Sequence, residues 1–381
     1  MLKVITVFGT RPEAIKMAPL VQELRKYPGE IDCKVVVTAQ HREMLDQVLQ
    51  LFKIKPDYDL DIMRANQSLF DITGRALYGL QDVFKSEEPG LVLVHGDTTT
   101  TFVGALAAYY LQITVGHVEA GLRTHDKYSP FPEEINRHLT GVLADLHFAP
   151  TSTARQNLIS EGISGEDIYI TGNTVIDALL ATVQPGYIFE DPILDKIDYR
   201  NRVLLVTTHR RENLGEPMRD IYRALREVLE SYQDVEVVFP VHKNPLVRNV
   251  VNEELGGVDR VHLIEPLEYK PFVNLINRSY LVLSDSGGLQ EEAPALGKPV
   301  LVLRNTTERP EAVAAGTVRL AGTGREDVLS ETSRLLDDHG YYSKMANAVN
   351  PYGDGRASER IVRAIKYNFG ISQEPVEEFH P

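Results

Sequence analysis

The chain of 381 residues has little cysteine and no long apolar segment. Its one cysteine, Cys33, cannot form an internal disulfide, and no second cysteine or histidine cluster makes it part of a zinc site. We interpret it as a small buried side chain beside the apolar run KVVV. No apolar run approaches the roughly 20 residues that span a bilayer, and no signal-peptide pattern precedes the first strand. These absences predict a soluble, cytoplasmic protein.

The chain also lacks an excess of positive charge. A formal net charge of -14 argues against nucleic acid or an anionic membrane surface as the main partner, because both attract a basic protein surface. Positive charge is nevertheless gathered locally, at Arg11 and Lys16, at residues 209–211 and at Arg309. A small anionic ligand is therefore compatible with the composition.

A third absence is the G-x-G-x-x-G fingerprint of dinucleotide-binding proteins. Gly9 directly follows the first apolar run, in GTRPEAIKMAPL, where we expect it to make a tight turn before a helix with Pro12 in its first turn. A single glycine does not make the fingerprint, which weighs against NAD and against transient oxidation of a sugar. No histidine spacing suggests a metal site. We therefore predict neither a cofactor nor a metal.

Apolar, β-branched runs alternate with amphipathic stretches along both halves of the chain, a pattern typical of parallel sheets. We predict an α/β protein with two doubly wound domains in tandem, residues 1–175 and 176–356, then a helix at 357–370 and a frayed, flexible tail at 371–381. The predicted strands are KVITVFG, KVVVTA, LVLVHGD, ITVGHVE, LHFAPT and IYITGN in the first half, and VLLVTTH, VEVVFPVH, VHLIEP, YLVLSDSGG, PVLVLR and TVRLAG in the second.

Carboxylates stand where two of these strands end. LVLVHGD ends on Asp97, and VGHVEAG carries Glu119. Ligands bind at the carboxyl edge of open parallel sheets, because loops and helix N-termini converge there. Glu133 follows in SPFPEEINR, at the start of a predicted helix, where an acid alone is typical of a solvated helix face. With Asp97 and Glu119 it makes three carboxylates that converge on one cleft, the first candidates for chemistry.

Cations near strand ends predict an anion site. Arg11 and Lys16 follow the first strand at a strand-to-helix corner, although a solvated helix face is the alternative. In the second half, His209 is followed by two arginines, and it is better placed than His242 to meet an anionic ligand.

The segment SDSGGLQEEAPALG combines a glycine turn with acids at a predicted helix start. Gly287 and Gly288 would let backbone amides approach a phosphate, Ser286 would add a hydroxyl, and Glu292 would accept hydrogen bonds from ribose hydroxyls. The alternative is that the acids only favour the helix N-terminus. The ligand implied is a nucleotide diphosphate.

These segments together resemble the non-hydrolysing UDP-N-acetylglucosamine 2-epimerases nearly from end to end. The resemblance rests on GTRPEAIK, TAQHREMLDQVL, HGDTTTT, VGHVEAGLRT, SPFPEEINR, THRRENLG, SDSGGLQEEAPALGKPVLV and TTERPEAVAAGT. It implies a GT-B fold of two Rossmann-like domains with an interdomain cleft, a C-terminal helix that returns to the first domain, and a homodimer without metal or nicotinamide. It also implies interconversion of UDP-N-acetylglucosamine and UDP-N-acetylmannosamine for bacterial surface polysaccharides.

The resemblance also assigns residues. The implied catalytic residues are Asp97, Glu119, Glu133 and His209, and the implied substrate contacts are Arg11, Lys16, Phe272, Ser286, Gly287, Gly288, Glu292 and Arg309. Leu267 stands where some members have a glutamine that contacts uridine. Some members bind an activating UDP-N-acetylglucosamine at positions that match Gln40 and His242. Glu43 and Asn66 differ from the glutamine and arginine of the strongly regulated members.

The implied reaction expels UDP from carbon 1 as carbon 2 loses its proton, giving 2-acetamidoglucal, and then adds UDP back with a proton on the opposite face. Three alternatives are a GT-B glycosyltransferase, a hydrolysing epimerase and a nucleotide-sugar sensor without catalysis. Three acids at one edge favour an epimerase, since an inverting transferase needs chiefly one base.

Overall fold

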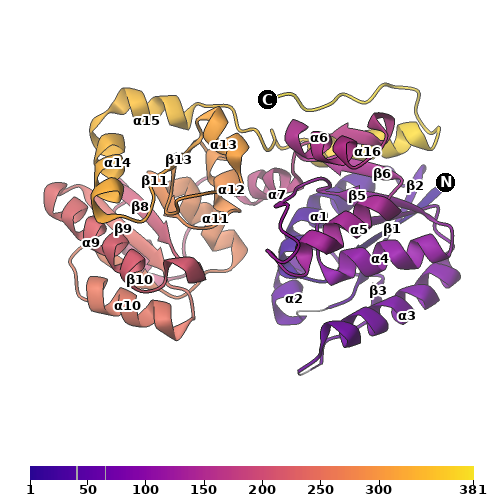
Figure 1. Cartoon of the computed structure of the whole chain (residues 1–381), viewed down its shortest axis with the longest axis horizontal. Coiled ribbons are helices and arrows are strands. Elements are labelled where there is room, and N and C mark those ends of the chain that lie inside the picture. The colour runs from indigo at the N-terminus through magenta and orange to yellow at the C-terminus, as the bar shows by residue number, and fades with distance from the viewer. Residues whose placement is uncertain (40–41, 65) are drawn as a thin grey trace. The chain divides into compact units, whose positions relative to one another are not determined.

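The computed structural model describes residues 1–39, 42–64 and 66–381, which divide into two compact units (Figure 1). Unit 1 comprises Met1–Ala178 and Tyr352–Pro381, and unit 2 comprises Leu179–Pro351. The first division falls inside helix α7 (Thr174–Thr182). Both divisions lie a few residues from the domain boundaries predicted after residues 175 and 356.

Unit 1 is built on a parallel sheet in which the described residues form seven strands, in the order β3-β2-β1-β4-β5-β6-β7. The order reverses between β1 and β4, which makes the carboxyl ends of these two strands the switch point where ligands bind in such sheets. The strands are β1 (Leu2–Phe8), β2 (Ile31–Val37), β3 (Tyr58–Asp59), β4 (Leu91–His95), β5 (Thr114–Val118), β6 (Leu146–Ala149) and β7 (Ile168–Ile170).

Helices connect the strands of unit 1 and bury its apolar residues. They are α1 (Arg11–Leu24), α2 (Arg42–Leu51), α3 (Leu69–Glu87), α4 (Thr99–Tyr110), α5 (Glu133–Leu143), α6 (Ser152–Ser160), α7 and α16 (Ala357–Asn368). Every residue of β4 is buried, as expected for a central parallel strand covered on both faces. One core cluster joins β4 to α3 and α4 through Val92, Val94, Leu80 and Val103. This packing gives the residues that follow β4 a rigid support.

The turn and helix start predicted after β1 are present, but Gly9 is required there for a different reason than the predicted tight turn. Thr10 and Glu13 make a reciprocal capping box at the start of α1, and Pro12 lies in its first turn. Gly9 does not have the positive φ of a tight glycine turn. Instead, a Cβ atom there would collide with the hydroxyl of Thr38. The glycine is therefore required by the close approach of the chain that follows β2.

Unit 2 contains a second parallel sheet, for which the described residues give six strands in the order β10-β9-β8-β11-β12-β13. The strands are β8 (Arg202–Thr207), β9 (Val235–Pro240), β10 (Val261–Ile264), β11 (Leu281–Ser284), β12 (Val300–Val302) and β13 (Val318–Leu320). The switch point lies between β8 and β11. The predicted class of two doubly wound α/β sheets is confirmed, and of the strands only the two-residue β3 was not predicted.

The helices of unit 2 flank this sheet. They are α8 (Pro192–Lys196), α9 (Glu216–Ser231), α10 (Pro245–Leu255), α11 (Tyr269–Arg278), α12 (Leu289–Ala295), α13 (Pro310–Ala315), α14 (Arg325–Asp337) and α15 (His339–Ala346). Its core cluster includes Tyr222 and Leu225 of α9 with Val237 and Phe239 of β9.

Helix α16 belongs to unit 1, where it packs on α1. The ammonium of Lys366 lies 2.7 Å from a carboxylate oxygen of Glu30 and 4.2 Å from the centre of the Tyr27 ring. The carboxylate of Asp177, on α7, accepts hydrogen bonds from the backbone N–H groups of Ala357 (3.1 Å) and Ser358 (2.7 Å). A buried side chain from another helix thus caps the N-terminus of α16.

The chain after α16 is attached to unit 1, so the prediction of a frayed tail is wrong at Glu378 and Phe379. The Phe379 N–H donates to the carbonyl of Ile170 (2.8 Å), and its ring is buried. The Glu378 carboxylate accepts from the Ile170 N–H (3.1 Å) and pairs with Arg155 (3.1 Å). The acidic composition of the tail suggested exposure to solvent, but the Glu378 carboxylate accepts a hydrogen bond from a backbone N–H of β7.

We expect Asp177→Ala to loosen α16. The substitution leaves two buried N–H groups without their acceptor, which costs about 1–3 kcal/mol of unfolding free energy. Asp177→Asn keeps one acceptor oxygen and serves as the milder control. Urea unfolding and amide hydrogen exchange across α16 measure the effect. Wild-type protection of α16 in Asp177→Ala would contradict the capping role.

Candidate active site

Glu119, the first residue after β5, lies at the carboxyl edge of the unit 1 sheet in an unusual backbone conformation. Its φ is +60°, and its side chain is only 6% exposed. The left-handed region costs a non-glycine residue about 1–2 kcal/mol. Such residues persist where their surroundings hold them, and they concentrate at functional sites.

Arg137, on α5, holds Glu119 and joins it to Asp97. One guanidinium nitrogen donates to the carbonyl of Glu119. The other lies 3.4 Å from the Glu119 carboxylate and donates to the Asp97 carboxylate over 2.5 Å. Arg137 is buried, whereas the Asp97 side chain is 31% exposed. The two predicted acids therefore share one buried cation, and Asp97 is the more accessible of them.

The second carboxylate oxygen of Glu119 accepts hydrogen bonds from the Lys16 ammonium and from the Asn173 side-chain amide (2.9 Å). Burial alone raises the pKa of the Glu119 carboxyl, but the charges of Lys16 and Arg137 outweigh burial and hold that pKa well below its usual 4.5. Glu119 is therefore ionised at neutral pH. The structure thus brings together Lys16, Asp97 and Glu119.

Two further predicted residues of unit 1 make no hydrogen bond or ion pair with the described residues of this cluster. Glu133 begins α5, one turn before Arg137, and is half-buried. The neighbouring Glu134 instead accepts hydrogen bonds from the N–H groups of Thr124 (3.1 Å) and His125 (2.9 Å), which is a structural task. Arg11 begins α1, is half-buried and forms no ion pair with any described residue.

Sequence reasoning missed the residues that hold these acids. Arg137 lies one helical turn after Glu133 in EEINR, a spacing that could have marked it.

Glu13 is a second residue that the sequence analysis did not single out. It is buried and accepts hydrogen bonds from the N–H groups of Gly9 (3.1 Å) and Thr10 (2.8 Å) and from the Thr98 hydroxyl (2.6 Å). Burial raises the pKa of its carboxyl. Glu13 thereby ties the corner after β1 to the corner after β4.

In unit 2, a buried acid organises a basic loop. Asp285, after β11, is fully buried and accepts hydrogen bonds from the N–H groups of His209 (2.9 Å) and Arg210 (2.9 Å) and from the Asn213 amide (3.1 Å). Its carboxylate also lies 3.2 Å from Nδ1 of His209. Burial raises the pKa of Asp285, but these partners outweigh burial and lower it. Asp285 thus orients His209, whose ring is 40% exposed.

His242, two residues after β9, stacks on His209. The two ring centres are 5.7 Å apart and the planes are inclined by 22°. Burial lowers the pKa of His242, and His209 lowers it further. The predicted regulatory histidine is therefore in direct contact with the predicted catalytic one. The other predicted regulatory residue, Gln40, lies outside the described residues.

The predicted phosphate turn follows Asp285. The Ser286 N–H donates to the hydroxyl of Ser284 (2.9 Å), so this amide is used within the turn. A Cβ atom at Gly287 would lie 2.7 Å from a carboxylate oxygen of Glu308, which itself pairs with Arg210 (2.6 Å). Gly288 is exposed and immediately precedes α12. A side chain at position 287 would therefore displace the Glu308 carboxylate from its ion pair with Arg210.

The other predicted contacts of unit 2 lie on three elements near this turn. Glu292, on α12, accepts a hydrogen bond from the Tyr269 hydroxyl (3.4 Å), and Phe272 is half-buried on the same helix as Tyr269. Arg309 precedes α13, and its guanidinium pairs with the buried carboxylate of Glu291. Arg309 therefore carries a countercharge that a bound phosphate would compete with.

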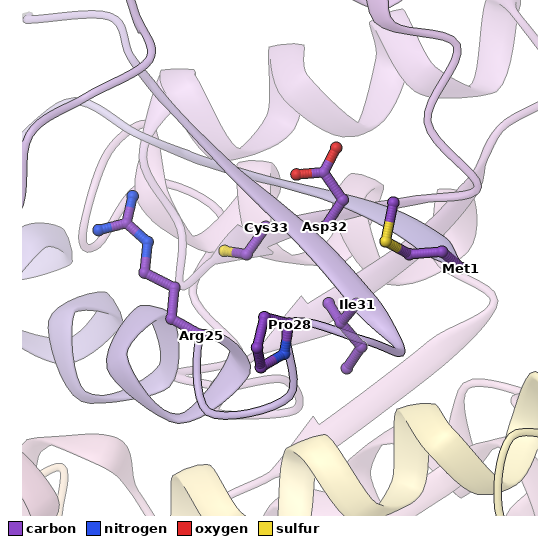
Figure 2. Close-up of a pocket in the computed structure, with 6 residues that line it drawn as sticks. All are labelled: Met1, Arg25, Pro28, Ile31, Asp32 and Cys33. Atoms are coloured by element: carbon purple, nitrogen blue, oxygen red, sulfur yellow. The ribbon is translucent and has the colours of Figure 1, made fainter.

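A cavity of about 390 Å³ lies at the opposite, amino edge of the unit 1 sheet (Figure 2). It is lined by Met1, Arg25, Pro28, Ile31, Asp32 and Cys33. Burial raises the pKa of the Cys33 thiol to about 12, so this thiol is protonated at neutral pH and is a weak nucleophile. Across the described ranges, no cluster of three or more candidate metal ligands occurs. No described helix has the length and apolar character to cross a membrane.

Two doubly wound sheets with polar groups at their carboxyl edges define an α/β protein of a class in which such edges commonly bind nucleotides. A family model described as UDP-N-acetylglucosamine 2-epimerase matches residues 22–366. The Bacillus subtilis (strain 168) UDP-N-acetylglucosamine 2-epimerase is 58% identical over 378 residues, which cover 99% of this chain and 98% of that protein. The chain belongs to the UDP-N-acetylglucosamine 2-epimerase family.

Solved structures agree with this assignment. UDP-GlcNAc 2-epimerase from Neisseria meningitidis bound to UDP-GlcNAc has a TM-score of 0.85 and 53% identity, covering 96% of this chain and 99% of that one. The S. aureus MnaA-UDP co-structure has a TM-score of 0.89 and 51% identity, covering 100% of both chains. The predicted family and the GT-B fold class are thereby confirmed.

The ion pairs of Glu119 predict a specific pH dependence. Its folded-state pKa is lowered, so its contribution to stability is present above the unfolded value of 4.5 and disappears as the pH falls through the folded-state value. We expect Glu119→Gln to lower the free energy of unfolding by about 3 kcal/mol at pH 7, because the buried Arg137 and the partly buried Lys16 both lose a charged partner. Urea unfolding from pH 7 to pH 3.5 would show this difference shrinking below 4.5. Asp97→Asn, at a more exposed partner of Arg137, should cost less. A difference that stays constant over this range would contradict the assignment.

Proposed function

We propose that the protein interconverts UDP-N-acetylglucosamine and UDP-N-acetylmannosamine without hydrolysis. The observation that carries this proposal is the cluster at the carboxyl edge of the unit 1 sheet, in which Arg137 contacts Asp97 and Glu119, and Lys16 pairs with Glu119. An acid pair with a cation beside it suits removal of a proton next to an anionic leaving group. Relatives named UDP-N-acetylglucosamine 2-epimerase, one of them solved with UDP-GlcNAc bound, support the choice of substrate.

The chemistry of carbon 2 favours elimination. Its proton is not acidified by an adjacent carbonyl, so simple deprotonation is unfavourable. Loss of UDP from carbon 1 together with the carbon 2 proton gives 2-acetamidoglucal, and re-addition of UDP with a proton on the other face inverts carbon 2. Two faces need two proton-handling groups, and Asp97, Glu119 and Glu133 share proton transfer and stabilisation of positive charge on the ring.

Lys16 links binding to this chemistry. Its ammonium neutralises Glu119 in the structure, and a bound diphosphate would compete for the same cation. When Lys16 turns to the diphosphate, Glu119 loses an opposite charge and its affinity for a proton rises. Substrate binding would thereby convert Glu119 from a stable carboxylate into a base.

Unit 2 supplies the groups proposed to hold UDP. Negative charge develops on the diphosphate as the bond to carbon 1 breaks, and preorganised donors stabilise it. His209 and the turn at residues 286–288 are proposed for this task, with Arg11 and Arg309. Glu292 would accept the ribose hydroxyls, and Phe272 would contact uridine.

Four narrower points are predictions from the family resemblance. They are a role in bacterial surface polysaccharide synthesis, a homodimer, a cytoplasmic location, and activation by UDP-N-acetylglucosamine at a second site that includes His242 and Gln40.

Incubation with UDP-N-acetylglucosamine in deuterated water, without metal or nicotinamide, tests the proposed reaction. We expect proton NMR to show UDP-N-acetylmannosamine with deuterium at carbon 2, because the carbon 2 proton leaves and returns through acids that exchange with solvent. Stoichiometric free N-acetylmannosamine with UDP would identify a hydrolysing enzyme instead. Binding of an unchanged sugar without deuterium uptake would contradict the proposal and favour a transferase or a sensor.

The proposed UDP site predicts an effect of Gly287→Ala. A Cβ atom 2.7 Å from the Glu308 carboxylate must displace it, and Glu308 pairs with Arg210 beside His209. We expect UDP to bind about tenfold more weakly, equivalent to about 1.4 kcal/mol, as measured by calorimetry. Gly29→Ala is the matched control, because its Cβ would meet nothing within 4 Å. Equal UDP affinities of the two variants would show that the turn at residues 286–288 does not take part in UDP binding.

A further inference from the structure

His95, the last residue of β4, is a buried histidine whose ring has no hydrogen-bond partner. Its side chain is 4% exposed, and neither Nδ1 nor Nε2 is paired with any described residue. By contrast, Nε2–H of the equally buried His117 donates to the carbonyl of Gly96 (2.7 Å). A buried polar group without a partner lowers stability by about 1–3 kcal/mol, so an apolar side chain of the same size would fill this space more favourably.

The ring of His95 is directed at the acid cluster. Its Nε2 lies 3.8 Å from Oε2 of Glu119, the oxygen that also binds Lys16 and Asn173. This separation exceeds a hydrogen bond by about 1 Å, a gap that a small rotation of either side chain closes. The space that Lys16 vacates when it turns to a diphosphate lies at the same oxygen. His95 is thus the adjacent uncharged base for that carboxylate.

Charged groups of both signs face this imidazole. Glu119 after β5 and Asp97 after β4 favour its protonation, whereas Lys16 of α1 and Arg137 of α5 oppose it. Burial is the largest influence and lowers the pKa of His95 to about 4. The ring is therefore neutral at neutral pH, and it retains one lone pair that can accept a proton.

We propose that His95 is a positioning residue that acts through Glu119 by exchanging a proton with its carboxyl group. The step rests on the proposed function. Glu119 takes the proton from carbon 2 and becomes a neutral carboxylic acid, which passes the proton to the lone pair of His95 Nε2. A carboxylate and an imidazolium result, and the reverse transfer restores both groups without any further reactant. Since His95 is buried behind Glu119, it does not contact the sugar.

Two substitutions separate this role from simpler ones. His95→Gln keeps a hydrogen-bond donor near Glu119 but cannot bind a proton at neutral pH, and His95→Phe fills the space without polar atoms. We expect kcat to fall about 100-fold in both, the lower end of the range for lost proton transfer. KM and the affinity for UDP should stay at wild-type values, because His95 does not contact the substrate.

The pH profile gives a readout that loss of packing would not change. We expect the ratio of wild-type to His95→Gln kcat to be flat between pH 6 and 8. The ratio should decline as the pH approaches 4, where the wild-type ring is already protonated and cannot take up a proton. His147→Phe is the matched control, because His147 is also buried in this sheet with a pKa lowered to about 4, and it should keep wild-type kcat.

Wild-type deuterium uptake in the same assay shows separately whether the proposed function holds. These outcomes apply once the wild-type protein is shown to be active. If His95→Gln keeps the kcat of the wild type, His95 supplies only a hydrogen bond. If His95→Phe keeps it, His95 only fills space. A raised KM with unchanged kcat would assign His95 to binding. Each of these results overturns the proton exchange. Hydrogen-exchange protection of β4 and β5 confirms that the variants are folded, and His95→Gln carries the test if His95→Phe is not.

Discussion

The guanidinium of Arg137 is the interaction on which the polar edge of unit 1 depends. It holds the carbonyl and carboxylate of Glu119 and the carboxylate of Asp97 from one buried position. Without this cation, two acids at neighbouring strand ends would repel each other and the left-handed backbone at Glu119 would lose its support. An arginine suits the task better than a lysine, because its planar fork directs several N–H groups at once.

In unit 2 the charges are reversed, because a buried carboxylate organises a basic segment. There, the buried carboxylate of Asp285 accepts hydrogen bonds from the backbone N–H groups of His209 and Arg210. In unit 1 the buried cation Arg137 holds two acids, and in unit 2 a buried acid holds a segment rich in arginine. The chain thus builds a cation-held acidic edge and an acid-held basic edge on separate sheets.

The sequence predicted the strands and the acids well, because both are local signals. Every predicted apolar run is a strand, and Asp97 and Glu119 stand at strand ends where the pattern put them. The partners of these acids were not predictable in the same way. Asn173 reaches Glu119 across 54 residues of sequence, and apolar periodicity reports burial and not such pairings. Phe379 shows the same limit, since its acidic surroundings hid an attachment to β7.

Asp177 and its hydrogen bonds to α16 show how the two units share one chain. The chain leaves unit 1 within α7 and returns at Tyr352, whose carbonyl accepts a hydrogen bond from the Asn173 N–H (2.7 Å). Exit and re-entry are thus fastened together, so unit 2 is an insertion into unit 1. During synthesis on the ribosome, the inserted unit is complete before the last helix of its host emerges. Unit 1 can therefore complete its packing with α16 only after unit 2 has been synthesised.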